Sequence, residues 1–356
     1  MFDLYSGNTP SRLNKEHFKG TVNWISSGEL KEHYIYSSKE QISEEAAKSL
    51  KLLPVGTFVI AIYGLEAEGV RGTGSIIQEP STISQACMSF IPKGVIKNEF
   101  LYSWYKKHGN VIGIRYAQGT KQQNLSYDIL EKFKIAYPNT KEQEKLNKFI
   151  SLLDERIATQ NKIIEDLKKL KCAIAERLFK VTNGEVVALS EVCNIQKGKQ
   201  VNGDCLSETG TYYVMNGGTE PSGYYEQCNA PADTISISEG GNSCGYVQYN
   251  RDAFWSGGHC YTLTDIQSNV CNLYLYHYLK SKESTIMKLR IGTGLPNIQK
   301  KDLEKFAVLL PPVVKQVRIS TFLTAIERKT TNEEILLSHF QEEKQYLLEG
   351  VSKLPI

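Results

Sequence analysis

The sequence is informative first through what it lacks. No stretch of eighteen apolar residues occurs among its 356 residues, so we expect no segment that spans a membrane. The opening residues, MFDLYSGNTPSR, lack the basic and then apolar stretches of a signal peptide. Eight cysteines occur without a Cys-x-x-Cys pair, which is typical of reduced thiols in a cytoplasmic protein rather than of a disulfide framework. These absences argue against secreted mini-proteins and membrane proteins.

Familiar catalytic and cofactor motifs are also missing. Residues 198–200 read GKQ and therefore fail the phosphate-binding pattern G-x-x-x-x-G-K-[ST]. The cysteines lack the spacing of zinc ligands. Two carboxylate pairs, Glu66 with Glu68 and Asp233 with Glu239, have no partner motif, and we expect them to be solvated loop residues. The sequence thus predicts no catalytic, cofactor or metal site in this chain.

The chain also has little net charge, +3 from 42 basic and 39 acidic residues. The balance is uneven, because residues 1–139 carry 16 basic and 13 acidic residues, whereas residues 183–310 carry 10 and 13. A domain that binds DNA unaided is usually more basic than this. We therefore expect any DNA binding to depend on locally placed cations or on phosphate contacts from partners.

A repeat of two copies organises the chain. Residues 119–133 read GTKQQNLSYDILEKF, and residues 292–306 read GTGLPNIQKKDLEKF, at an offset of 173. The same offset aligns Cys87 with Cys260, Pro138 with Pro311, and Gln143 with Gln316. Nearer the N-terminus the offset is 190, which places about 17 additional residues of the first copy, including an inserted helix, within 29–53.

The repeat also decides how His259-Cys260 is interpreted. This pair is conceivable as metal ligands or as a nucleophile with its base. Its counterpart is Ala86-Cys87, which keeps the thiol and drops the imidazole. The comparison favours a buried, small apolar cysteine in both copies.

Each copy has the same order of parts. A mixed part rich in glycine, serine, tyrosine and β-branched residues precedes a long helix. The predicted parts are residues 1–139, a helix over 140–182, residues 183–311 and a helix over 312–356. Strand-like runs at 57–62 and 234–237, and helices near 99–108 and 273–281, indicate two α+β units.

Apolar residues of the two long helices recur every three or four positions. In the first helix they are Leu146, Ile150, Leu153, Ile157, Ile164, Leu167, Ile174 and Leu178, with Gln160 and Lys171 at the skipped places. Adding 173 gives Ile319, Leu323, Ile326, Thr330, Leu337, Phe340, Leu347 and Val351, with Glu333 and Lys344 at the skipped places. This spacing predicts a coiled-coil seam between two antiparallel helices of about 60 Å each. The alternative is that each helix packs only on its own unit.

These features together resemble the specificity subunit of type I restriction-modification enzymes. The likeness lies in residues 6–30 and 217–247, in both GT…N…LEKF segments, and in the helices after PNTKEQ and PPVVKQ. It implies an α+β fold in which two pseudo-symmetric α/β target-recognition domains are separated by two long antiparallel coiled-coil helices. Each domain then reads one half of a bipartite DNA target, while the helices set the spacing and dock the methylation subunits.

The resemblance also implies partners and cofactors. Expected partners are double-stranded DNA, methylation subunits, of which two are expected, and restriction subunits reached through the complex. No cofactor is expected in this chain, and S-adenosylmethionine, ATP and Mg²⁺ are expected on the partner subunits. Such a subunit is not an enzyme by itself and works in the cytoplasm.

One departure concerns the start of the first copy. The second copy opens with residues 187–192 before the turn at Gly198, whereas only six residues precede the equivalent Gly7. We therefore expect the first unit to lack an opening strand of roughly ten residues.

Base-reading residues cannot be carried over by motif, so candidates come from side-chain chemistry. Arginine and lysine suit guanine edges and phosphates, and asparagine and glutamine suit adenine. The candidates are Arg12, Lys15, Arg71, Lys121, Gln122 and Gln123 in the first unit, and Lys197, Lys199, Gln200, Asn216, Arg251 and Asn297 in the second. For each, the alternative is a solvated surface side chain.

Two other functions stay open at this point. The chain is compatible with a stand-alone DNA-modifying enzyme whose site has no familiar motif, and with a coiled-coil adaptor that binds only proteins. Activity of the chain without partners would favour the enzyme, and a lack of DNA protection within the complex would favour the adaptor.

Overall fold

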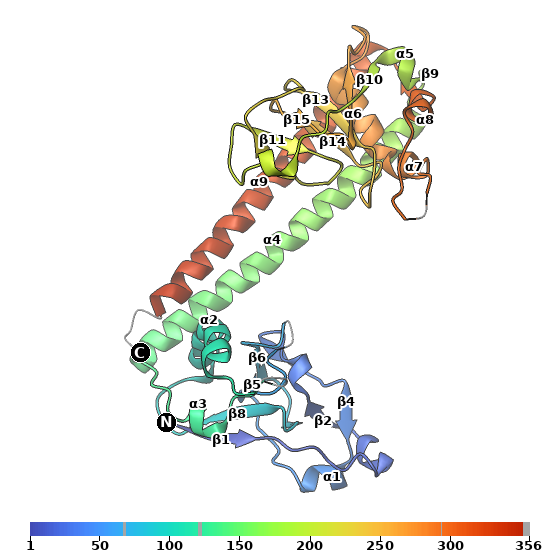
Figure 1. The fold of residues 1–356 in the computed structure, drawn as a ribbon. Coiled ribbons are helices and arrows are strands. Elements are labelled where there is room, and N and C mark those ends of the chain that lie inside the picture. The colour runs from blue at the N-terminus through green and yellow to red at the C-terminus, as the bar shows by residue number, and fades with distance from the viewer. Residues whose placement is uncertain (67–68, 120–122, 293, 352–356) are drawn as a thin grey trace. The chain divides into compact units, whose positions relative to one another are not determined.

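The computed structural model describes residues 1–66, 69–119, 123–292 and 294–351. The chain forms two compact units: unit 1 contains Met1–Thr159 with Leu337–Ile356, and unit 2 contains Gln160–Leu336. Each unit therefore combines one globular part with a portion of each long helix (Figure 1). Within the described ranges, no helix is both long and apolar enough to cross a membrane.

The centre of unit 1 is a five-stranded sheet in the order β1-β8-β5-β6-β3. Its strands are β1 (Phe2–Ser6), β8 (Cys87–Pro92), β5 (Phe58–Ala61), β6 (Gly74–Ile77) and β3 (Tyr34–Ile35). All pairings are antiparallel except the one between β3 and β6. Both β5 and β6 are buried along their whole length, with α2 (Asn98–Tyr116) packed against them. The strand predicted over 57–62 is thus present as β5.

A second, three-stranded sheet in unit 1 has the order β4-β2-β7. Its strands are β2 (Val22–Ile25), β4 (Glu40–Ile42) and β7 (Ser81–Ile83), and the nearby short helices are η1 (Lys15–Phe18), η2 (Ser27–Glu29), α1 (Glu44–Lys48) and α3 (Tyr127–Leu130). The helix expected within the inserted segment is α1, which begins after the capping residue Ser43. Its single buried residue, Ala46, joins Trp24 and Ile42 in a small apolar cluster.

Unit 2 is built from three small sheets, in the orders β10-β16-β13-β14, β12-β11-β15 and β17-β9. The strands are β9 (Glu185–Ala188), β10 (Asn194–Lys197), β11 (Tyr212–Met215), β12 (Tyr224–Tyr225), β13 (Thr234–Ser238), β14 (Val247–Asn250), β15 (Trp255–Ser256), β16 (Cys260–Thr264) and β17 (Ala307–Leu310). The helices are α5 (Leu189–Val192), α6 (Asn272–Ser281), α7 (Glu283–Met287) and α8 (Lys300–Glu304), with a short η3 (Gly203–Cys205). The predicted strand at 234–237 and the helix near 273–281 are present as β13 and α6.

The two units repeat one plan. The order β1-β8-β5-β6 in unit 1 corresponds to β10-β16-β13-β14 in unit 2, with antiparallel pairing throughout. Gly7 and Gly198 follow the first strand of each set. A Cβ at Gly7 would lie 2.1 Å from the carbonyl oxygen of Ile83, and one at Gly198 would lie 2.2 Å from that of Gly257. The backbone approaches so closely at both turns that only glycine fits.

The two units differ in the strand pairing of the segment that leads into each long helix. In unit 2 this segment is β17, which pairs antiparallel with β9 and places Val308 opposite Val187. The repeat aligns β17 with residues 134–137 of unit 1, which pair with no strand among the described residues. The described part of unit 1 therefore has no counterpart of the β9–β17 pair.

The long helices are α4 (Thr140–Val181) and α9 (Val313–Val351), with 42 and 39 residues. Within unit 2 they run antiparallel, because Gln160 and Lys171 of α4 contact Glu333 and Glu327 of α9 in reverse order. Within unit 1, Asp154 of α4 pairs with Lys344 of α9 and Arg156 lies over the Phe340 ring, again in reverse order. Each predicted seam residue whose side chain is described is buried or half-buried. The predicted fold, with two repeat-equivalent units and two long antiparallel helices, is confirmed.

Polar residues occupy the places that the apolar spacing skips. Gln160 Nε2 donates to Glu333 Oε2 at 2.5 Å, and these two residues are themselves equivalent in the repeat. The ion pair between Lys171 and Glu327 has the pair between Lys344 and Asp154 as its repeat equivalent. Buried polar pairs in a coiled coil specify register, so these three contacts set how α4 and α9 align within each unit.

Candidate nucleic-acid interface

Polar side chains gather at one end of the four-stranded sheet of unit 2, where β10 and β13 end and β16 begins. Lys197 Nζ lies 2.6 Å from Glu239 Oε1, and the Tyr261 hydroxyl donates to the same oxygen at 3.0 Å. The Glu239 side chain is only 12% exposed, so the expectation that it is solvated is wrong. Burial and the nearby Glu239 charge raise the pKa of Tyr261, which keeps its hydroxyl protonated as a donor. The carboxylate therefore fixes the Lys197 ammonium at the sheet end.

Two predicted asparagines join this end of the sheet through neighbouring loops. Asn216 Oδ1 accepts a hydrogen bond from the backbone N–H of His259 at 3.1 Å. The backbone of Asn297 pairs with Gly240, the residue after Glu239. Asn297 is exposed and Asn216 half-exposed. Their amide groups thus lie on loops that the sheet holds in place, while the side chains retain access to a ligand.

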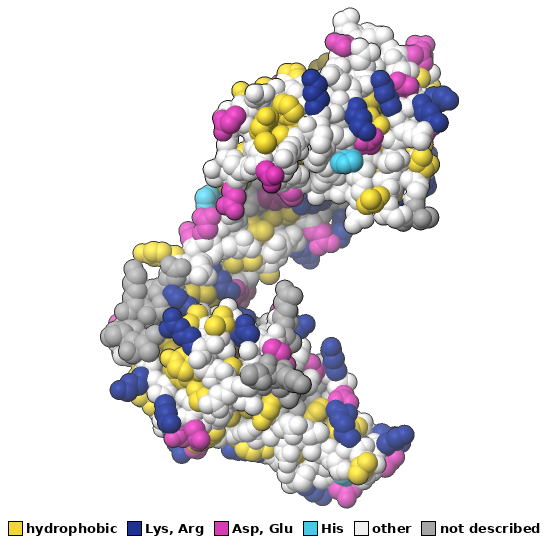
Figure 2. Space-filling view, in the orientation of Figure 1, with side chains coloured by type: hydrophobic (Ala, Val, Ile, Leu, Met, Phe, Trp, Pro, Cys, Tyr) yellow, Lys and Arg dark blue, Asp and Glu magenta, His cyan; other side chains and the backbone are white. Residues whose placement is uncertain are grey.

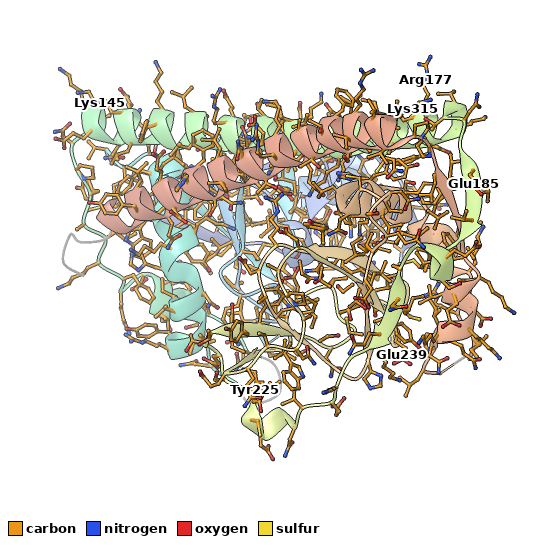
Figure 3. All side chains as sticks on the ribbon, turned by 90° about the horizontal axis from the view of Figure 1, so that it is seen from above. Lys145, Arg177, Glu185, Tyr225, Glu239 and Lys315 are labelled. Carbon is orange, nitrogen blue, oxygen red and sulfur yellow. The ribbon has the colours of Figure 1, made fainter. Side chains whose placement is uncertain are left out.

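Lys199 and Gln200 follow the Gly198 turn at the same end of the sheet. The Lys199 backbone is held on both sides, because its N–H donates to the Ser256 carbonyl at 2.8 Å and its carbonyl accepts from Trp255 Nε1 at 2.8 Å. Both Lys199 and Gln200 are exposed. Figure 3 shows Glu239 and Tyr225 of unit 2 on the side away from Arg177 and Lys315, which belong to the long helices. The candidate face of unit 2 therefore lies opposite its helical side.

Arg251 does not join this group. It is exposed and follows Asn250, which is opposite Thr234 at the start of β13. The other five candidates of unit 2 lie near the end of β13, so Arg251 is at the opposite end of the sheet.

In unit 1 the structure brings Arg71 and Gln123 together. Arg71 Nη2 donates to Gln123 Oε1 at 3.1 Å, and the Gln123 backbone N–H donates to Glu66 Oε2 at 2.8 Å. That backbone hydrogen bond lowers the pKa of Glu66 and keeps it charged beside the arginine. The bridge between Tyr63 and Asn124 in these loops matches the one between Gly240 and Asn297, so the two clusters occupy equivalent positions in the repeat.

Arg12 and Lys15 lie elsewhere in unit 1. Arg12 forms a bidentate ion pair with Glu40, with Nη to Oε distances of 3.0 and 2.8 Å, and its guanidinium lies over the Phe18 ring. The same pairing lowers the pKa of Glu40. Lys15 is exposed in η1, near this pair because η1 also contains Phe18. Arg12 is thus engaged by Glu40 although its side chain is 58% exposed, and Lys15 is exposed beside it.

Two candidates, Lys121 and Gln122, lie outside the described residues, as does Glu68. Figure 2 shows the basic side chains of each unit, on the face in view, scattered among acidic ones rather than joined in one band. This pattern agrees with the small net charge of +3. For the face in view, we therefore expect local and modest electrostatic attraction to phosphates.

The thiols behave as expected from the repeat. Cys87 and Cys260 are both buried, and burial raises the pKa of their thiols, to about 12 for Cys87 and about 11 for Cys260. Neither is a thiolate at neutral pH, which excludes them as activated nucleophiles. Among the described residues, no group of three or more His, Cys, Asp or Glu side chains is placed to hold a metal ion.

Comparison with known protein families identifies the family of this chain. The sequence model of the type I restriction modification DNA specificity domain matches residues 1–169 and 182–338, most of the chain. This chain belongs to that family. DNA specificity within a type I restriction-modification system is therefore its function, and its own role is recognition rather than catalysis.

Similar proteins carry the same description. The chain is 24% identical to the MjaIX specificity subunit of Methanocaldococcus jannaschii, over 87% of this chain and 81% of that protein. It is 31% identical to the EcoR124I/EcoR124II specificity subunit of Escherichia coli, over 46% of this chain and 41% of that protein. A crystal structure of the S subunit from M. genitalium superposes with a TM-score of 0.68 at 18% identity, covering 100% of this chain and 94% of that one, which shows a shared fold.

The sequence predicts a solvated Glu239, offers His259 only beside Cys260 and gives no signal for Tyr261, yet these three residues contact the candidate face of unit 2. These residues share only their position at one edge of the sheet. Glu239 directly follows β13, His259 directly precedes β16, and Tyr261 is the second residue of β16. Recognising this edge requires the pairing of β13 with β16, which joins residues more than twenty positions apart.

Proposed function

We propose that each unit reads one half of a bipartite duplex target through the face described above. The supporting observation is that Gln123, which contacts Arg71 in unit 1, and Asn297 of unit 2 lie on the repeat-equivalent segments 119–133 and 292–306. Two equivalent readers in one chain match a target made of two half-sites.

The side chains in unit 2 divide by the chemistry they offer. Asn216 and Asn297 have amides suited to the N6 and N7 edge of adenine, and Gln200 offers the same group. Lys197 and Lys199 suit guanine edges or phosphates. The ion pair with Glu239 holds Lys197 in one direction, which favours a base contact over a loose phosphate contact.

In unit 1 the corresponding reader is the Arg71–Gln123 pair. Arg71 is held in a fixed orientation, because the Gln123 amide oxygen accepts a hydrogen bond from one guanidinium nitrogen. The other N–H groups of the guanidinium remain as donors to the ligand. Lys15 and the segment that contains Lys121 and Gln122 supply further candidates for backbone contacts. Arg12 is a weaker candidate, because it would have to leave Glu40.

The long helices α4 and α9 set the spacing between the half-sites and bind the methylation subunits in this proposal. Exposed apolar residues recur at repeat-equivalent places on them, Phe149 with Phe322 and Ile163 with Leu336. Large apolar side chains exposed on a helix are typical of a protein interface. Because the places occur twice, two methylation subunits are expected, with restriction subunits joining through that complex.

Catalysis then lies with the partners. S-adenosylmethionine, ATP and Mg²⁺ belong to the methylation and restriction subunits in this proposal, and the complex works in the cytoplasm.

The test is footprinting of the assembled complex on its methylated target. Asn297→Ala should weaken protection in one half-site, and Arg71→Ala in the other, each by about tenfold, since a lost bidentate base contact costs about 1–3 kcal/mol. Arg251→Ala is the matched control in unit 2, because Arg251 lies at the other end of the sheet, and it should leave protection unchanged. The assignment is contradicted if either variant weakens DNA protection in both half-sites, or if Arg251→Ala weakens protection as much as Asn297→Ala does.

A further inference from the structure

His259 lies among the predicted DNA-binding residues of unit 2, although its side chain has no role in the account above. Its backbone N–H donates to Asn216 Oδ1 at 3.1 Å. Its ring lies against Gly240, because a Cβ added there would be 3.6 Å from His259 Nδ1. The backbone of Gly240 in turn pairs with Asn297. His259 therefore contacts two of the loops that form the candidate face.

The imidazole also faces the buried carboxylate of Glu239. His259 Nδ1 lies 3.8 Å from Glu239 Oε2, and the two side chains are 63% and 12% exposed. Lys197 and the Tyr261 hydroxyl both bind the other carboxylate oxygen, Oε1. Oε2 is buried and accepts no hydrogen bond from the residues that the structure describes. A buried acceptor without a donor is unfavourable, so a small rotation that brings Nδ1–H of the imidazole to Oε2 would be stabilising.

Other titratable groups surround this pair. Lys197 comes from β10, Tyr261 comes from β16, and Cys244, in the loop after β13, donates its thiol hydrogen to the carbonyl of Glu239. Burial raises the pKa of both Tyr261 and Cys244, so both side chains are neutral at neutral pH. Arg290, after α7, is a positive charge near Cys244. Apart from the carboxylate, the charged groups named here are cations, whose charge a bound duplex would offset.

We propose that His259 is a further DNA contact of unit 2 and that it takes up a proton from the solvent when the duplex binds. Nδ1–H then donates to Glu239 Oε2, and Nε2–H donates to an acceptor on the duplex. Bound DNA brings negative charge to this face, which favours the protonated form of the imidazole. This inference rests on the proposed function, because it places the duplex on the same face.

Two groups on DNA have the required chemistry. A phosphate oxygen and the O6 and N7 atoms of guanine all accept hydrogen bonds from cationic side chains. Loss of a phosphate contact weakens binding to the same extent on all sequences, whereas loss of a base contact relaxes specificity at one position. Binding to targets with single base changes therefore distinguishes the two acceptors.

The repeat confines this contact to unit 2. The equivalent of His259 in unit 1 is Ala86. The backbone N–H of Ile62 donates to the Ala86 carbonyl at 2.9 Å, as that of Glu239 donates to the His259 carbonyl at 2.9 Å. The places of the carboxylate and the imidazole are thus apolar in unit 1, so we expect no proton uptake there.

The experiment measures binding of the assembled complex to a labelled duplex that contains its target, by fluorescence anisotropy at constant salt between pH 8 and pH 6. The unaltered complex should bind about three- to tenfold more tightly at pH 6, since uptake of one proton contributes at most about tenfold per pH unit. His259→Gln retains a hydrogen-bond donor but has no titratable charge. It should abolish the gain at pH 6 and bind about as tightly as the unaltered complex at pH 8.

His339→Gln is the matched control for other sources of pH dependence. His339 Nδ1 lies 3.7 Å from Glu342 Oε2, and its side chain is 64% exposed, so the pair resembles that of His259 in distance and exposure. Glu342 is 71% exposed, however, and both residues lie on α9 within unit 1. His339→Gln should leave the gain in affinity at pH 6 unchanged.

Asn297→Ala separates this inference from the function on which it rests. If Asn297→Ala weakens protection of one half-site but the His259→Gln complex retains the full gain at pH 6, the inference fails and the proposed function stands. If neither variant changes DNA binding at either pH, both fail. Equal affinity of the unaltered complex at pH 6 and pH 8 would also overturn the inference.

Discussion

The ion pair between Lys171 and Glu327 offers a direct test of how the helices are held together in unit 2. Lys171 Nζ lies 2.7 Å from Glu327 Oε1, which also accepts from the Tyr276 hydroxyl at 2.9 Å. Burial alone would raise the pKa of Glu327, but the hydrogen bond and charge of Lys171, together with the Tyr276 hydrogen bond and the nearby His277, outweigh it and lower the pKa. The lowered pKa keeps the carboxylate charged, and Lys171 makes the largest contribution to that lowering.

Lys171→Met removes that cation and leaves the glutamate half-buried. Losing one partner of a fully buried pair costs about 3–5 kcal/mol, and an exposed pair contributes about 0–1 kcal/mol. The side chains here are 20% and 29% exposed, so we expect a loss of about 2 kcal/mol in the free energy of unfolding. Adding Glu327→Gln should recover part of it, because the amide has no charge to desolvate and still accepts from Tyr276.

The chain supplies its own controls. Lys168, one turn earlier on α4, pairs with Glu334 at 2.7 Å, but these side chains are 61% and 44% exposed. Lys168→Met should therefore change stability by less than about 0.5 kcal/mol. The repeat-equivalent Lys344→Met should have an intermediate effect, because Lys344 and Asp154 are 31% and 35% exposed.

Urea unfolding followed by circular dichroism measures these differences, with the midpoint and slope fitted together. Equal losses from Lys171→Met and Lys168→Met, or no loss from Lys171→Met, would refute the reasoning. So would a Lys171→Met/Glu327→Gln double variant less stable than the single one.

Three further outcomes are expected. Burial lowers the pKa of His277 from 6.5 to about 4, so the unfolded chain takes up a proton at a higher pH than the folded chain does. The stability present above pH 6.5 should therefore fall by roughly 2 kcal/mol as the pH is lowered to 4.5. His277→Gln should flatten this decline in melting curves measured as a function of pH. One heptad inserted at repeat-equivalent places in α4 and α9 should lengthen the preferred spacer between the two half-sites by about three base pairs, because each helical residue adds 1.5 Å and each base pair spans 3.4 Å. Methylation of a library of targets with graded spacers measures the preference. An unchanged preference would contradict the claim that the helices set the spacer length. Phe149→Asp with Phe322→Asp should reduce co-purification of the methylation subunits, whereas charge changes at the exposed Lys168 should not.

Much of the helical part was predictable from the sequence. The seam follows from apolar spacing alone, and the residues that break that spacing, Gln160 and Lys171, have partners on the facing helix. A repeat of two copies predicts antiparallel helices related by a two-fold axis. The structure agrees, because Gln160 contacts its own repeat equivalent, Glu333. Local periodicity was sufficient here because each helix satisfies its own backbone hydrogen bonds.

The candidate faces were less predictable. Strands such as β12 and β15 have two residues each, too few to show alternation, and they pair with segments far along the chain. Arg12 has the chemistry of a DNA contact, yet Glu40, 28 residues away, engages it. Glu239 reads as a loop carboxylate, and its burial depends on Lys197 and Tyr261 from neighbouring strands. Such roles arise from long-range pairing, which no single stretch of sequence displays.

The central claim is that one chain contains two independent readers of DNA. The most direct test exchanges residues 183–311 for the equivalent part of another specificity subunit and maps methylated adenines genome-wide in cells that express the hybrid with its methylation subunits. The account predicts that one half of the methylated sequence changes, while the other half and the spacer length remain those of the original. A change in both halves would contradict it.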